Sequence, residues 1–258
     1  MTGARPPEAV RVALERGVAR VTLANPAKLN ALDRAAIEAL GAAVRGLSAD
    51  PGLRAVVITG EGPKAFSGGV NVNELGATTP RTAREAITRL HRAITAVREC
   101  PAPVIARVNG YCIGGALELA AACDLRIAAD HARFGMPEVR LGIPSVIEAA
   151  LLARLMGAGR ARWLLITGEL IDAAEALRWG LVERVVPAAQ LDAEVDAALE
   201  AILAGGAQAI RAQKQLNRAY EELPFAQAVA HSIDAFEAAY ATGEPERLIG
   251  DYLRRRKR

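Results

Sequence analysis

A strand-like run, a glycine pair and a helix-forming stretch follow one another around residue 110, and this junction constrains the fold more than any other feature. The run Val104–Val108 is mostly apolar and β-prone, Gly114 and Gly115 then break the pattern, and the helical stretch behind them carries Glu118. The first amides of such a helix have no partners within the helix, and the positive end of its dipole lies there. Glu118 would lie about 4.5 Å along the helix axis from Gly115. A hydrogen-bond donor and a carboxyl group would therefore share one small volume, which suits a carbonyl oxygen that becomes negative during a reaction.

A second glutamate, Glu138, comes directly after Phe134–Pro137. Two carboxyl groups in a poorly solvated pocket can hold different protonation states, which acid–base chemistry requires. Glu148 is a third acidic candidate, but Ser145–Glu148 has the S-x-x-E form of a capping box, so we interpret it as structural.

Other reactive side chains give weaker signals. The histidines have no shared motif or metal-like spacing, so we interpret them as surface or hydrogen-bonded residues (His91, His131 and His231). Ser67 lacks the G-x-S-x-G context and a partner histidine, which argues against nucleophilic serine catalysis. We expect no metal site.

The composition places the chain among globular proteins. Its 258 residues are 52% hydrophobic and 24% charged, which is enough for a large core and atypical of a disordered chain. No apolar run approaches the roughly 20 residues of a membrane span, and the N-terminus has no secretory signal pattern. The three cysteines have no C-x-x-C spacing. We therefore expect reduced thiols, a cytoplasmic location and no membrane association.

The net charge of +3 is concentrated at one end. Residues 251–258 have five basic side chains and one acidic side chain, which leaves a net charge of −1 for the rest. A nearly neutral body with a short basic end is not the pattern of a nucleic-acid-binding fold, so nucleic acid is an unlikely partner.

Hydrophobic periodicity predicts a mixed α/β core followed by a helical end. We predict strands over Val10–Leu14, Ala19–Leu23, Ala55–Thr59, Val104–Val108, Leu125–Ala128 and Leu181–Val186. We predict helices over Asp33–Leu47, Thr82–Arg98, Gly115–Cys123, Asp192–Leu203, Ala207–Glu222 and Ala226–Ala241. The predicted division is a core of residues 1–190 and a helical region of residues 191–258.

Four segments in order resemble the crotonase (enoyl-CoA hydratase/isomerase) superfamily, and together with the helical end the resemblance covers nearly the whole chain. They are Asn25–Leu32, Ala65–Asn71, Asn109–Glu118 and Phe134–Glu138. The resemblance implies a spiral of ββα units with a C-terminal helical region that contributes to trimers or pairs of trimers and covers the active site.

The resemblance also implies an acyl-coenzyme A ligand. The thioester oxygen would lie between the backbone N–H groups of Val70 and Gly115. Family members that add water to a 2-enoyl thioester have glutamates at the positions of Glu118 and Glu138. By this resemblance Glu118 deprotonates the attacking water and Glu138 exchanges the proton at Cα, with no cofactor beyond the coenzyme A of the substrate.

Five further positions match family positions that contact coenzyme A. Lys28 resembles a residue near the phosphates, and the backbone of Ser67 and Gly68 resembles the adenine-binding segment. Tyr252 and Arg255 match C-terminal positions that reach the coenzyme A of a neighbouring subunit in trimers.

The chain also departs from the common family pattern. Val70 and Asn71 replace an alanine and an aspartate, and Pro144–Glu148 replaces a glycine-rich turn. These changes leave the acyl substrate open. They also keep double-bond isomerisation and thioester hydrolysis as alternatives to hydration, with a non-catalytic or RNA-binding homologue more remote.

Overall fold

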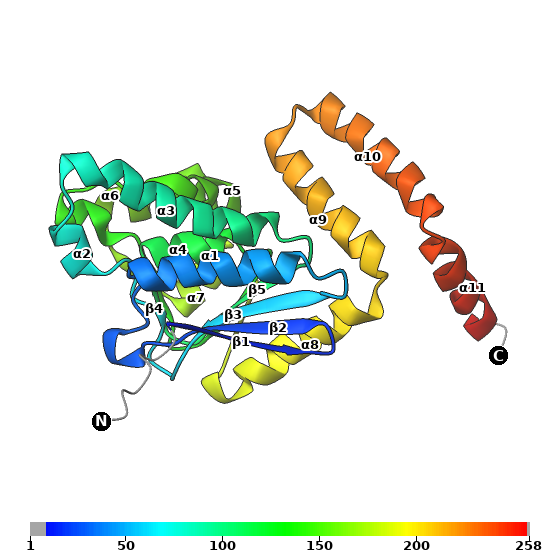
Figure 1. Ribbon diagram of the computed structural model, residues 1–258, viewed down its shortest axis with the longest axis horizontal. Helices are drawn as coiled ribbons and strands as arrows, with labels where there is room; N and C mark the ends of the chain where they lie inside the picture. Colours follow the sequence, from blue (N-terminus) through cyan, green and yellow to red (C-terminus); the bar gives the residue numbers. More distant parts are fainter. Residues whose placement is uncertain (1–8, 257–258) are drawn as a thin grey trace, which may run out of the picture.

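The computed structural model describes residues 9–256, which form two β-sheets covered by helices and a helical arm at the C-terminal end (Figure 1). The larger sheet has the strand order β1-β2-β3-β5-β7-β10. Only β1 and β2 pair antiparallel, and every other pair in this sheet is parallel. Its strands are β1 (Val10–Glu15), β2 (Val18–Leu23), β3 (Ala55–Gly60), β5 (Val104–Val108), β7 (Leu125–Ala129) and β10 (Arg184–Val186).

Helices cover both faces of this sheet, as the apolar character of its central strands requires. On one face lie α1 (Arg34–Ser48) and α3 (Pro80–Glu99), which pack against each other (Figure 1). The other face is covered by α8 (Leu191–Ala204), whose buried Leu191, Val195 and Leu199 pack on the sheet.

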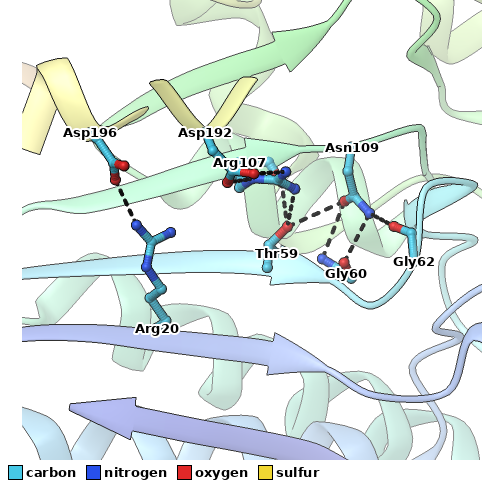
Figure 2. A network of polar contacts seen from close by, with 8 residues as sticks. All are labelled: Arg20, Thr59, Gly60, Gly62, Arg107, Asn109, Asp192 and Asp196. Carbon is cyan, nitrogen blue, oxygen red and sulfur yellow. Dashed lines mark hydrogen bonds and ion pairs between the residues drawn. The ribbon is translucent and has the colours of Figure 1, made fainter. Parts of the chain in front are cut away.

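Ion pairs hold α8 against the sheet, and Thr59 links one of them to the amide network around Asn109 (Figure 2). Arg20 pairs with Asp196 at 2.7 Å, and Arg107 pairs with Asp192 at 2.7 Å. These charged pairs are partly exposed, so they orient the helix more than they stabilise it.

The second sheet is small and carries the segments that lead to the site. Its order is β4-β6-β8-β9, with β8 and β9 antiparallel. These strands are β4 (Ala65–Ser67), β6 (Tyr111–Ile113), β8 (Arg133–Gly135) and β9 (Leu170–Asp172). The turn after β6 leads into α4 (Gly115–Ala122), in which every residue is buried.

Short helical elements complete the core. They are η1 (Pro26–Lys28), α2 (Val72–Gly76), η2 (Pro137–Leu141), η3 (Ile147–Leu151), α5 (Leu152–Met156), α6 (Ala158–Thr167), α7 (Ala173–Trp179) and η4 (Ala188–Gln190). No helix within residues 9–256 combines the length and the apolar character needed to cross a membrane.

A helical arm extends away from the sheet and consists of α9 (Ala207–Glu222), α10 (Phe225–Ala241) and α11 (Glu244–Arg256) (Figure 1). One side of α9 contacts the core, where the buried Lys214 pairs with Asp124 at 2.7 Å. In α10 only Ala228 is buried, and large apolar side chains of α10 and α11 are exposed.

The structure confirms the predicted mixed α/β class with a helical C-terminal region. The division at residue 190 stays a prediction, although α8 packs on the sheet and the arm begins only with α9. One local prediction is wrong. Ser145 and Glu148 do not form a capping box, because Val146 is the residue before η3 and no side chain caps that helix.

Candidate active site

A cavity of about 550 Å³ brings most of the predicted residues together. It lies between α2, α3, the start of α4 and the turn that follows η2. Most of its lining is apolar, including Val72, Leu75, Ile87, Leu90, Ile143 and Val146. The same cavity is lined by Glu118, Glu138 and two glycine-containing backbone segments around Val70 and Gly115. The chemistry-bearing groups therefore share one predominantly apolar volume.

Glu118 reaches the cavity from the first turn of α4. Because α4 is apolar all round and lies inside the core, Glu118 is only 3% exposed. The Ala149 amide donates to its Oε1 at 3.2 Å. Burial, followed by the negative charge of Glu138, raises the pKa of Glu118 to about 8, although the Ala149 amide acts in the opposite direction. This carboxyl group can therefore exchange a proton near neutral pH.

Glu138 approaches from η2 on the other side of the α4 start. Its Oε2 accepts a hydrogen bond from the Ser145 hydroxyl at 2.8 Å. Gly114 has φ +56°, and a Cβ at this position would lie 2.4 Å from Glu138 Oε1. Gly114 therefore permits both the positive φ of the turn into α4 and the close approach of the Glu138 carboxyl group.

The backbone segments at Val70 and Gly115 lie against each other. A Cβ on Gly69 would come 3.7 Å from the Gly115 nitrogen, and one on Gly115 would come 3.1 Å from Val70 Cγ2. Among the backbone hydrogen bonds of residues 9–256, neither the Val70 amide nor the Gly115 amide donates to a protein carbonyl. Both donors therefore remain for a ligand, as an oxyanion-binding pair requires.

Buried asparagines hold the chain that leads to Val70. Asn109 Nδ2 donates to the carbonyls of Gly60 at 2.9 Å and Ala65 at 3.2 Å, and also to Gly62 (Figure 2). Asn30 Nδ2 donates to Ala65 at 2.9 Å. These side chains satisfy carbonyls that the tight turn before β4 would otherwise bury without partners.

The predicted coenzyme A residues are more dispersed. Gly68 lines the cavity, and Ser67 lies buried beside it with its hydroxyl accepting from the Gly69 amide at 3.1 Å. Lys28 in η1 is exposed and does not line the cavity, and Tyr252 and Arg255 are exposed on α11, outside the cavity. Their predicted role depends on a neighbouring subunit or on the bound coenzyme, so it stays a prediction.

Sequence reasoning missed contacts made by the turn after η2 and by the start of η3. Ser145 contacts Glu138, Ala149 contacts Glu118, and the buried Glu148 contacts His91 at 2.7 Å. The S-x-x-E pattern drew attention to this segment but assigned it to the wrong structure. Asn71, an apparent departure, caps α2 by accepting from the Asn73 amide at 3.0 Å.

Comparisons with known proteins agree with this architecture. The family model described as enoyl-CoA hydratase/isomerase matches residues 13–258. The chain is 35% identical to a crotonyl-CoA hydratase of Syntrophomonas wolfei, over 94% of each chain. A crystal structure of an enoyl-CoA hydratase from Bacillus anthracis is similar with a TM-score of 0.90 and 32% identity, covering 97% of both chains.

A second solved structure bears on the ligand. A putative enoyl-CoA hydratase from Thermobifida fusca in complex with CoA is similar with a TM-score of 0.84 and 34% identity, covering 91% of this chain and 94% of that one. The predicted crotonase-type fold is thereby confirmed. Family match, relatives and fold agree over nearly the full length, and the chain belongs to the enoyl-CoA hydratase/isomerase family.

Proposed function

We propose that this protein is an enoyl-CoA hydratase that adds water across the 2,3 double bond of a 2-enoyl-CoA thioester. The observation that carries the proposal is the convergence of Glu118, Glu138 and the free backbone donors of Val70 and Gly115 on one cavity. The named hydratase relatives support the same reaction.

The proposed mechanism begins with polarisation of the thioester. The amides of Val70 and Gly115 donate to its carbonyl oxygen, which makes Cβ electrophilic and stabilises the enolate that follows. Removing one donor of this kind typically costs about 10²–10³ in rate.

Two proton transfers then complete the addition. The ionised Glu118 takes a proton from water as the water oxygen bonds to Cβ, and the electron pair of the double bond moves toward the thioester oxygen. As the enolate collapses, the protonated Glu138 gives its proton to Cα. Return of one proton from Glu118 to Glu138 restores the starting state, so this scheme needs no metal or redox cofactor.

The mainly apolar lining supports a hydrocarbon acyl chain, while the coenzyme would lie toward Gly68, Ser67 and Lys28. We further propose a homotrimer or a pair of trimers in the cytoplasm. In this assembly Tyr252 and Arg255 reach the coenzyme of a neighbouring subunit. The exposed apolar side chains of α10 and α11 support that assembly.

The test is the ultraviolet absorbance of the conjugated thioester in crotonyl-CoA. We expect wild-type protein to remove this absorbance. Glu118→Gln should slow its loss by about 10²–10⁴, the usual contribution of a general acid or base. Acyl-CoA affinity should change little in this variant, because the proposed oxygen donors are main-chain groups.

The rival reactions give different readings. Unchanged crotonyl-CoA absorbance with appearance of a conjugated thioester from a 3-enoyl substrate would establish an isomerase. Release of free coenzyme A thiol would establish a hydrolase. A wild-type rate in Glu118→Gln would exclude the paired-glutamate mechanism.

A further inference from the structure

We propose that Glu148, held by His91, is a positioning residue that orients the turn whose Ala149 amide contacts Glu118. The hydrogen bond between His91 on α3 and Glu148 on η3 thus influences the proposed catalytic carboxyl group of Glu118 through the Ala149 amide. This inference rests on the proposed function.

Glu148 is a buried carboxyl group, and the S-x-x-E pattern does not explain its burial because no capping box forms. It is 7% exposed, and within residues 9–256 its Oε2 has no hydrogen-bond partner. Its Oε1 lies 2.7 Å from His91 Nδ1. Burying a carboxyl group costs free energy unless a specific partner compensates, and here the compensating partner is His91. Burial raises the pKa of Glu148, and His91 opposes that shift.

The residue before Glu148 is strained. Ile147 has φ +43°, a value that β-branched residues rarely adopt. Such a conformation costs about 1–3 kcal/mol and persists only where neighbouring contacts fix it. The Glu148–His91 bond is a polar anchor on the next residue, so it is placed to hold this turn.

The held turn delivers a donor to the active site. The Ala149 amide is shared between the Val146 carbonyl at 3.0 Å and Glu118 Oε1 at 3.2 Å. Shared donors of this type are common at helix ends, and a small rotation of the turn shifts the amide from one acceptor to the other. Release of Glu148 would therefore weaken the bond to Glu118 without removing any group from the cavity.

The experiment compares His91→Ala, Glu148→Ala and Glu148→Gln with a control, Arg92→Ala. His91 is half exposed, so its replacement does not open the core, and Arg92 is exposed on the same helix. We expect kcat for crotonyl-CoA hydration to fall about tenfold in His91→Ala and Glu148→Ala, because the Glu118 carboxyl group would be misplaced. KM should stay nearly unchanged, because no group that binds the substrate is removed. Glu148→Gln can still accept from His91 and should stay within about threefold of wild type.

Amide hydrogen exchange of the peptide that contains Ala149 gives a readout independent of activity. We expect faster exchange in His91→Ala and Glu148→Ala, and wild-type exchange in Glu148→Gln and Arg92→Ala. Unchanged kcat in properly folded His91→Ala, or a Glu148→Gln defect as large as that of Glu148→Ala, would overturn the positioning role. If the wild-type protein hydrates no enoyl-CoA, the proposed function is refuted. The exchange measurement still tests the anchoring of the turn, which is overturned if His91→Ala and Glu148→Ala exchange the Ala149 amide as slowly as the wild type.

Discussion

Glu118 is an acid whose pKa depends on its burial and on three neighbours. Burial raises its pKa most, the charges of Glu138 and Glu148 raise it further, and the Ala149 amide lowers it. The balance places the pKa at about 8, whereas an ordinary glutamate titrates near 4.5. A carboxylate that is hard to ionise is a stronger base once ionised, which matches the proposed removal of a proton from water.

This pKa predicts the pH dependence of catalysis. In the proposed reaction Glu118 is ionised while Glu138 holds a proton, so the pair must carry one proton in total. We therefore expect kcat/KM for crotonyl-CoA to fall as pH rises through an inflection near 8, where the pair loses that proton. The inflection belongs to the coupled pair of glutamates rather than to Glu118 alone. Steady-state kinetics between pH 6 and pH 9, taken as roughly one to two units on either side of the pKa, would measure it.

Glu118→Gln is the control, and its residual activity should lack the inflection near 8. A wild-type profile that instead rises with pH through 8 would mean that the reaction needs both glutamates ionised, which would exclude Glu138 as the proton donor.

The residues of the site were predictable only in part. Glu118, Glu138 and the glycine turn are visible because their residue types carry the chemistry. The contact from Ala149 is invisible in sequence, since a backbone amide can come from any residue except proline. His91 and Glu148 lie on separate elements, and no local pattern joins them.

At the scale of elements, the turn between β3 and β4 is held by side chains rather than by the strands. Asn109 is 4% exposed, and it bonds the backbone carbonyls and amide of this turn (Figure 2). A Cβ on Gly60 would lie 2.1 Å from the Ala65 carbonyl oxygen, which shows how closely the two limbs approach. The position of Val70 depends on this turn.

Asn109→Ala should therefore affect both stability and rate. The variant removes the side-chain donor to the Gly60 and Gly62 carbonyls, whereas Ala65 still accepts from Asn30, so we expect a loss of about 1–3 kcal/mol in the free energy of unfolding. Urea denaturation should show a lower midpoint with an unchanged slope, and kcat should fall in the fraction that remains folded.

Asn217→Ala provides the matched control, because Asn217 is exposed on α9. Its effect should stay within about 0.5 kcal/mol. If Asn109→Ala is as stable as this control, water replaces the Asn109 side-chain amide, and the hydrogen bonds of Asn109 do not stabilise the fold.

Most of the long elements were predictable from sequence, whereas most of the short ones were not. Except for the three-residue β10, the strands of the larger sheet and the helices α1, α3, α4 and α8 to α10 are runs of five or more residues with a clear apolar composition or periodicity. The strands of the second sheet have three residues each, which is too short for a period of two to be distinguished from chance. Their existence depends on pairing between residues far apart in the chain.

At the scale of the whole molecule, the arm contrasts with the core. Along α10 and α11, several large apolar side chains are about half exposed or more, including Phe225, Ile233, Phe236, Tyr240 and Tyr252. Exposure of so many large apolar side chains on two consecutive helices is typical of a contact between protein chains. The proposed trimer would cover it.

Phe236→Glu tests this assembly. Phe236 is 67% exposed and stacks edge-on with Tyr240, so the substitution leaves the core intact and places a charge on the apolar face. We expect wild-type protein to run as a trimer or a pair of trimers in analytical ultracentrifugation, and Phe236→Glu to shift toward monomer. Glu237→Ala, at the adjacent exposed position, should keep the wild-type mass. A trimer that survives Phe236→Glu would exclude this face of α10 from the contact.

The proposed oxygen donors belong to the peptide backbone, and this has a consequence for how the protein can vary. Apart from proline, no coded substitution at Val70 or Gly115 deletes an N–H group, so an alanine scan of the cavity would detect the acids and overlook half of the machinery. Substitutions at Val70 can change the shape of the cavity around the acyl chain and still retain the backbone N–H donor. Deleting that donor cleanly calls for an amide-to-ester exchange in a semisynthetic chain.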